Sequence, residues 1–241
     1  MKAIRLLAAA ALALGAAASA AAESITLEGI TFSDALGGIV LVGGRGRGTL
    51  EDPFVVVEII TDDGPGVLTI RGLDSDFGNR IASHHLAGFA LTKIVCNGTG
   101  RDWLSFDLEL RERLADHSPY EDGLSFGQGT LAGRPFLSDI FRDADEISEP
   151  FDKVSFSGGT VPPGGTVAVT VVITDSTPRP VFYLLQKRGK PVAERRDRPP
   201  GPVAKASLTG TKCLFETGLL ERHGGESSRF RRTGPRFSFG S

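Results

Sequence analysis

The sequence is poor in the residues that are typical of disulfide-rich, metal-binding and sugar-binding proteins. It contains 2 cysteines, 4 histidines, 1 tryptophan and 2 tyrosines in 241 residues. Disulfide scaffolds need a far denser set of cysteines, and zinc sites need clustered histidines or cysteines. Platforms that stack on ligands are usually rich in tryptophan and tyrosine. These shortages argue against all three classes.

The first residues have the pattern of an export signal. "MKAIRLLAAAALALGAAASAAAES" begins with Lys2 and Arg5, continues through an uncharged Leu/Ala run and ends in small residues. The apolar run is shorter than the roughly 20 residues that cross a bilayer. We therefore interpret residues 1–22 as a signal peptide, with a mature start near Glu23 and a periplasmic or extracellular location. No later segment approaches a membrane span, so we expect no transmembrane segment after cleavage.

Two cysteines remain in a chain expected to enter an oxidising compartment. A bridge between Cys96 and Cys213 would close a loop of more than 100 residues and contribute about 4 to 5 kcal/mol in the chain-entropy model. Cys213, however, lies in a segment with little sign of order. We favour unpaired cysteines, and the bridge stays open as the alternative.

The near-neutral net charge of −2 hides two halves of opposite sign. Residues 23–185 hold 12 Lys and Arg against 24 Asp and Glu, a net charge of −12; residues 186–241 hold 13 against 5, a net charge of +8. An acidic body repels a polyanion before contact. We therefore exclude nucleic acid as a partner of the body.

Strand patterning fills the body of the chain. Val167, Val169, Val171 and Ile173 alternate with threonines, which indicates a half-buried strand. In "DWLSFDLEL", Leu104, Phe106, Leu108 and Leu110 are predicted to share a second inward face. Similar runs are "SITLEGITF", "GGIVLVGG", "PFVVVEII", "GVLTIRGL", "KVSFSGGTV" and "RPVFYLLQ". Their number and spacing predict an all-β fold, a single antiparallel β-sandwich of about 8 to 10 strands of Ig-like or jelly-roll-like build over residues 23–186.

Turn residues separate these runs. Asn97-Gly98 is a strong hairpin signal, and Pro162-Pro163-Gly164-Gly165 is expected to form a turn because proline lacks the ladder donor and glycine tolerates positive φ. Helical patterning is confined to a possible single turn near Ser138–Phe141. This excludes an alternating α/β sheet.

One part of the chain resembles a known class of proteins. "ALTKIVCNGTGRDWLSFDLEL", "DGLSFG" and "VSFSGGTVPPGGTVAVTVVITD" are similar to exported bacterial β-sandwich proteins of Ig-like build. In those proteins an Asn-Gly hairpin precedes a Trp/Phe strand, and a PPGG turn precedes a Val/Thr strand. The resemblance covers about residues 89–186. It implies a fold and an export route, and it transfers no catalytic residue.

Composition changes abruptly after Gln186. Residues 187–241 are rich in Arg, Gly, Pro and Ser without sustained periodicity, which is typical of a low-order segment. Only "TKCLFETGLLERH" could form a turn or two of helix. A basic arm for anionic cell-surface polymer is one interpretation of this tail. An extension without a role is the interpretation we favour.

Ser125 lies in Gly123-Leu124-Ser125-Phe126-Gly127, which matches the G-x-S-x-G pattern of α/β-hydrolases. There the serine works on a strained turn from a strand into a helix. The "QGTLAGRP" that follows here cannot make that helix. We interpret the match as a coincidental glycine-rich loop.

The candidate metal ligands are weakly arranged. His84 and His85 are adjacent and would point to opposite faces of a strand, while His117 and His223 are isolated. Zinc is therefore not expected. Two acidic clusters offer oxygen ligands, but neither completes a calcium loop, and we interpret both as solvated acids with calcium as the alternative. The clusters are Asp74-x-Asp76 and Asp143-x-Asp145-Glu146.

Three further motifs have simple structural explanations. Asp107 and Glu109 share a strand face at a spacing that a glycosidase pair could use, but acids on the outer face of a strand normally face solvent. Gly43–Gly48 resembles a phosphate cradle, yet no strand-then-helix pattern surrounds it. Asn97-Gly98-Thr99 matches a glycosylation sequon, for which the turn is a sufficient explanation. Trp103 is expected in the core.

The sequence thus assigns no catalytic, cofactor-binding or metal-ligating residue. We predict an exported, non-enzymatic structural or binding module whose partner is a protein or a cell-surface polysaccharide. The alternative is an extracytoplasmic hydrolase of polysaccharide or ester substrates, which would need Ser125 or several acids brought into one cleft.

Overall fold

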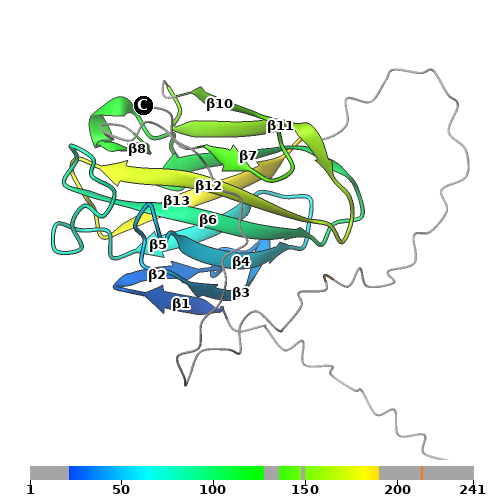
Figure 1. Cartoon of the computed structure of the whole chain (residues 1–241), viewed down its shortest axis with the longest axis horizontal. Helices are drawn as coiled ribbons and strands as arrows, with labels where there is room; N and C mark the ends of the chain where they lie inside the picture. Colours follow the sequence, from blue (N-terminus) through cyan, green and yellow to red (C-terminus); the bar gives the residue numbers. More distant parts are fainter. Residues whose placement is uncertain (1–21, 128–135, 148–149, 190–212, 214–241) are drawn as a thin grey trace, which may run out of the picture.

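Two facing β-sheets make up the computed structural model, which describes residues 22–127, 136–147, 150–189 and 213 (Figure 1). Sheet A has the order β1 (Ser24–Leu27), β2 (Ile30–Ser33), β5 (Gly66–Arg71), β13 (Val181–Arg188), β7 (Trp103–Arg111), β11 (Lys153–Val161), β10 (Asp143–Ile147). Sheet B has the order β3 (Ile39–Arg45), β4 (Phe54–Ile60), β6 (Ala87–Asn97), β12 (Thr166–Asp175), β8 (Leu124–Phe126), and β9 (Leu137–Ser138) also pairs with β12. The predicted all-β, two-sheet architecture is confirmed.

Two details of the predicted sandwich are wrong. The described residues contain 13 strands rather than 8 to 10, because "SITLEGITF" folds back on itself as β1 and β2 and because short strands were not foreseen. The sheets are not wholly antiparallel, since β4 runs parallel to β6 from Phe54 opposite Leu91 to Ile60 opposite Asn97. Between these two strands the chain crosses to sheet A to form β5.

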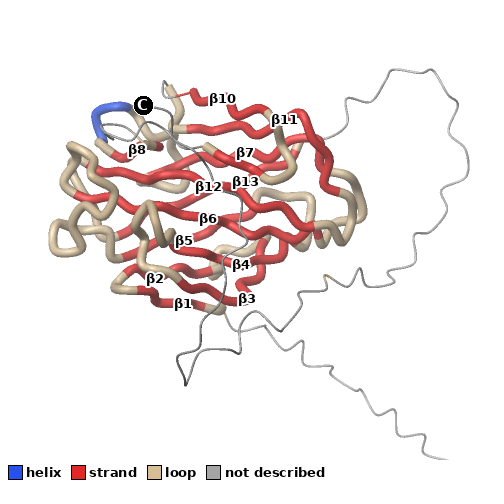
Figure 2. Tube along the Cα trace, in the orientation of Figure 1, coloured by secondary structure: helices blue, strands red, loops and turns tan. Residues whose placement is uncertain are grey.

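Strands dominate the described chain, and its one helical turn is the 3-10 turn at Tyr120–Asp122 (Figure 2). The helical turn predicted at Ser138–Phe141 is wrong: β9 ends at Ser138, whose hydroxyl accepts the N–H groups of Ile140 and Phe141 in a non-helical bend. Within the described ranges, no helix is long and apolar enough to span a membrane.

The alternation predicted for the core is largely confirmed. Val167, Val169, Val171 and Ile173 of β12 are all fully buried between the sheets. Trp103 is fully buried as well and stacks on Phe106, with ring centroids 6.0 Å apart. Each such side chain contributes about 1.5 to 3 kcal/mol by leaving water.

Leu104 is the exception to the predicted alternation. Its side chain is 39% exposed, whereas Trp103 before it points inward. The register of β11 against β7 shifts between Ser157 and Val161, so that Val161 lies opposite Trp103. A bulge of this kind exchanges the inward and outward positions of a strand, which is why simple alternation placed Leu104 in the core.

The predicted Asn97-Gly98 hairpin is wrong in its pairing. β6 belongs to sheet B and β7 to sheet A, so residues 98–102 cross from one sheet to the other. The turn at Pro162–Gly165 does form, with the Gly165 N–H bonded to the Pro162 carbonyl oxygen at 2.8 Å. It also joins strands of different sheets, since β11 lies in sheet A and β12 in sheet B.

Asn97 connects these two crossings. Its backbone N–H donates to the Gly165 carbonyl oxygen at 2.8 Å, and its carbonyl oxygen accepts the Gly164 N–H at 2.7 Å. Its side-chain amide donates to the Arg101 and Val161 carbonyl oxygens at 2.8 and 2.9 Å. Asn97 is fully buried, so the sequon match is explained by this structural role.

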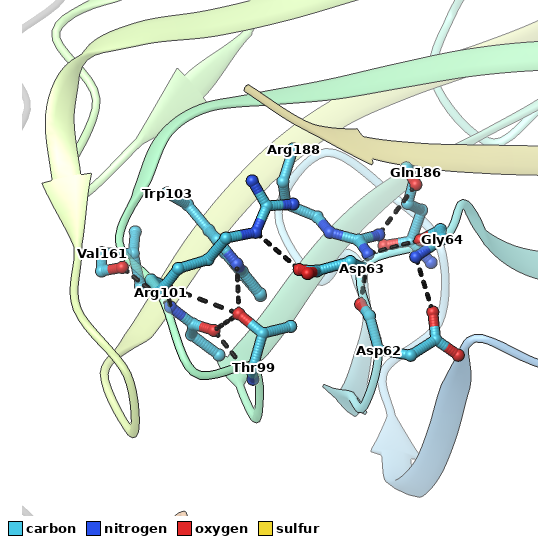
Figure 3. A network of polar contacts seen from close by, with 10 residues as sticks. Asp62, Asp63, Gly64, Thr99, Arg101, Trp103, Val161, Gln186 and Arg188 are labelled. Carbon is cyan, nitrogen blue, oxygen red and sulfur yellow. Dashed lines mark hydrogen bonds and ion pairs between the residues drawn. The ribbon is translucent and has the colours of Figure 1, made fainter. Parts of the chain in front are cut away.

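The same end of the sandwich carries a wider polar network (Figure 3). Thr99 accepts the Trp103 indole N–H at 3.0 Å, and Arg101 forms an ion pair with Asp63 at 2.5 Å. Arg188, at the end of β13, donates to the Asp62 and Gly64 carbonyl oxygens. These contacts hold the connection between β4 and β5 against the β6–β7 crossing.

The expectation of unpaired cysteines is wrong. Cys213 is bonded to Cys96, with their Cα atoms 6.2 Å apart, a separation that suits a disulfide. Cys96 lies near the end of β6, so the bridge attaches the C-terminal part of the chain to the end of the sandwich that contains Asn97. The segment interpreted as a signal peptide, apart from Ala22, lies outside the described residues. Of the tail predicted over residues 187–241, only residues 187–189 and Cys213 are described.

We expect Asn97→Ala to destabilise the protein by about 2 to 4 kcal/mol, because it leaves buried carbonyl and N–H groups without partners. Urea denaturation followed by tryptophan fluorescence measures this cost. Asn79→Ala is the matched control, since the Asn79 side chain forms five hydrogen bonds, all of them within its own surface loop, against four for Asn97. Equal losses for the two variants would contradict the special role of Asn97.

Candidate functional site

The candidate site lies at the opposite end of the sandwich from Asn97, in the connection between β7 and β8. A pocket of about 370 Å³ opens there. Its lining residues are mostly acidic: Glu112, Arg113, Asp116, His117, Pro119, Glu121 and Asp122. The sequence analysis did not identify this pocket, and the only signal for it was the density of acids in "RERLADHSPYED".

Local hydrogen bonds fix the shape of this connection. The Asp122 carboxylate accepts the Ser118 hydroxyl and the Leu124 N–H, the latter at 3.0 Å. The Ser176 N–H donates to the Gly123 carbonyl oxygen at 3.0 Å, and Gly123 has a φ of 81°, which favours glycine. The acidic connection is therefore attached to the residues that follow β12.

Three carboxyl groups at this end have raised pKa values. Burial is the main cause for Glu112, Asp122 and Asp175, and their mutual repulsion adds to it for Glu112 and Asp175. The pKa of Asp175 rises to about 6. Hydrogen bonds and Arg179 work in the opposite direction, and Arg179 contacts Glu112 at 2.8 Å. The site thus concentrates negative charge that its own cations do not fully neutralise.

A second, smaller pocket of about 210 Å³ shares Glu121 with the first. It is lined by His85, Glu121, Gly123, Leu124, Ser125, Asp152 and Ser176. The fold therefore does bring Ser125 and His85 to one place. Ser125 is buried on β8, and its hydroxyl pairs with that of Thr174 at 3.2 Å. Among the described residues no hydrogen bond joins Ser125 to His85, so the contact that activates a serine nucleophile is not formed.

Asp107 and Glu109 do not form a catalytic pair. Asp107 is paired with Lys153 at 2.9 Å. Glu109 is nearly buried and contacts Lys187 at 2.8 Å and Arg111 and His117 at 2.7 Å each. Burial raises the pKa of Glu109, but hydrogen bonds from these three groups outweigh burial and lower it to about 2. A carboxylate held ionised in this way cannot serve as a general acid. The expectation that Glu109 faces solvent is wrong.

The remaining acidic and histidine candidates are scattered. Asp74 accepts the N–H groups of Asp76 and Phe77 in a local turn, and Asp143, Asp145 and Glu146 lie on β10 at the edge of sheet A. In the described part of the chain, no group of three or more His, Cys, Asp or Glu residues could hold a metal ion. His223 lies outside the described residues.

The glycine-rich segment at Gly43–Gly48 also has a structural role. Its first residues belong to β3, and the N–H groups of Arg47, Gly48 and Thr49 all point to the Asp52 carbonyl oxygen at 2.9 to 3.2 Å. The donors that a phosphate would need are thus used within the loop.

Sequence reasoning also missed a buried ion pair in the core, between Glu58 of β4 and Lys93 of β6. Its signal was present: Phe54, Val56, Glu58 and Ile60 alternate along one strand face, which places Glu58 at an inward position. Lys93 occupies the corresponding position in "FALTKIV".

Comparisons with protein-family models, with curated proteins and with solved structures gave no match. The function therefore has to be inferred from the residues themselves.

We expect the stability of the protein to fall as the pH rises from about 4 to about 6, in part because of Asp175. Its pKa is about 6 in the folded chain against an ordinary 3.8, so the folded state holds more protons in this window than the unfolded state. Asp175→Asn removes this titration and keeps the oxygen that accepts the Thr177 N–H. Above pH 6 the variant should gain on the order of 1 kcal/mol, or about 2 to 4 °C in Tm.

Thermal denaturation at about pH 3.5 and about pH 7.5 checks this prediction, because the gain should vanish at the lower pH. Glu51→Gln, an exposed acid in the loop between β3 and β4, is the control. A gain for Asp175→Asn that is the same at both pH values would contradict the assignment.

Proposed function

We propose that this chain is an exported, non-enzymatic binding module of Ig-like build, whose acid-lined pocket between β7 and β8 binds a cationic group of its ligand. The observation that carries this proposal is the pocket of about 370 Å³ whose lining combines four carboxyl groups, those of Glu112, Asp116, Glu121 and Asp122, with Arg113 and His117. Export is supported by the signal-like residues 1–22.

The chemistry of the ligand follows from the charge of the pocket. Burial is the main cause of the raised pKa values of Glu112 and Asp122, and repulsion from neighbouring carboxylates adds to it. A cation that arrives beside them favours their charged forms, because each charged form then gains a partner. A cationic ligand such as an amine would therefore bind more tightly when Glu112 and Asp122 are ionised. An anionic ligand would meet repulsion.

A binding role agrees better with the rest of this end than hydrolysis does. Ser125 is hydrogen-bonded to Thr174 rather than to a base, and Glu109 is paired with Lys187 and Arg111 and in contact with His117. The pocket instead sits on connections that are held by the sheets, as binding loops on a rigid sandwich commonly are.

The test is thermal denaturation of the mature chain near pH 7 with spermidine or putrescine, each compared with sodium chloride at equal ionic strength. A ligand at about 100 times its Kd should add roughly 2.7 kcal/mol, or about 5 to 10 °C in Tm. Glu112→Gln/Asp122→Asn should abolish most of the shift, since it removes two carboxylates from the pocket.

Asp143→Asn/Asp145→Asn is the control for that test. It makes the same change in net charge on exposed residues of β10, and it should leave the shift intact. An equal loss in both double variants would indicate general charge screening. No shift with either cation would contradict the proposal.

A further inference from the structure

The sandwich core contains one ion pair that is fully removed from water. Lys93 Nζ lies 2.7 Å from Glu58 Oε2, and both side chains are 0% exposed. The two residues lie on neighbouring parallel strands, with Lys93 opposite Val56 and Glu58 opposite Val95. Both point inward among the residues of the main apolar cluster.

This pair is poorly suited to stay ionic. Neither Lys93 Nζ nor either oxygen of Glu58 forms a directional hydrogen bond within the described part of the chain. A buried ion pair offsets the loss of hydration only when further hydrogen bonds satisfy its remaining donors and acceptors. Transfer of the proton from the ammonium to the carboxylate relieves this cost, and it leaves a neutral amine beside a neutral acid.

The state of Lys93 agrees with that transfer. Burial lowers the pKa of the Lys93 amine, and this effect exceeds the opposing influence of Glu58. An unprotonated amine has the free electron pair that a nucleophile needs. The Glu58 carboxyl group is held beside this amine by two paired strands. Such fixed placement can be equivalent to an effective concentration of about 10⁵ to 10⁸ M.

We propose that Lys93 and Glu58 condense into an amide cross-link between β4 and β6. The electron pair of Nζ forms a bond to Cδ of Glu58, the bond from Cδ to its hydroxyl oxygen breaks, and that hydroxyl leaves with one amine proton as water. No oxidant or further reactant is needed. The product replaces two buried charges with one neutral amide, which is less costly to bury.

The positions of the trypsin sites make the cross-link detectable in the wild-type protein. Trypsin cuts after Arg47, Arg71, Arg80 and Arg101 but cannot cut after a lysine whose amine is acylated. Reduced, alkylated and digested protein should therefore yield a branched peptide joining residues 48–71 to residues 81–101. Its mass should equal the sum of the two peptides less one water molecule.

Mass spectrometry of the full chain, purified in folded form, is the test. We expect the branched peptide and no cleavage after Lys93. The Lys153–Asp107 pair is an internal control, since it has a similar separation of 2.9 Å but is partly exposed, and it should not be linked. Lys93→Met should abolish the branched peptide, and the protein should then have the mass its sequence predicts.

Separate peptides 48–71 and 81–93 in the folded wild-type protein would overturn the proposal. This result requires no variant, so a failure of Lys93→Met to fold leaves the test intact. The outcome is also independent of the binding proposal, because the pair lies in the core and does not line the acidic pocket.

Discussion

The structure depends on how Asn97 satisfies the backbone where the chain passes from one sheet to the other. A crossing between two sheets removes strand partners from residues that are also withdrawn from water, and each unpaired group there costs about 1 to 3 kcal/mol. Asn97 supplies hydrogen-bond partners at two crossings at once. Its backbone bonds to Gly164 and Gly165, and its side chain bonds to Arg101 and Val161. Asn97 thus joins the crossing that follows β6 to the crossing that follows β11.

The two ends of the sandwich differ in how their charged side chains are paired. At the Asn97 end, Arg101 and Arg188 bind Asp63 and the carbonyl groups of the β4–β5 connection. At the other end, Glu112, Asp122 and Asp175 repel one another, and Arg179 is the cation that pairs with Glu112. The charged side chains of the first end thus have partners inside the fold, whereas the second end holds several carboxyl groups close together. The carboxyl-rich end is the one to which the proposed cationic ligand would bind.

Local patterns predicted what depends on local physics. The alternation of Val167 to Ile173 predicted a half-buried strand, and β12 has that face buried. Asn97-Gly98 predicted a sharp turn after β6 but not that β7 lies in the other sheet. The same residues favour a turn within a hairpin and a turn between two sheets. Gly98 is required there by a contact that no local pattern reveals: a Cβ would approach the Ile60 carbonyl oxygen to 2.7 Å. The approach of Asp175 to Glu112 and Asp122 could not be predicted either, because only the topology brings these residues together.

The bond between Cys96 and Cys213 sets an order of events. Cys213 lies beyond Arg188, the last residue of β13, so the ribosome must have made every strand of the sandwich before the second thiol exists. In a chain that folds as it is synthesised, the bridge therefore forms only after the residues of both sheets are available. It then joins Cys213 to a β6 strand whose neighbouring strands have already been made. A chain interrupted before Cys213 would still contain all the described residues of both sheets, but it would lack the covalent link to β6.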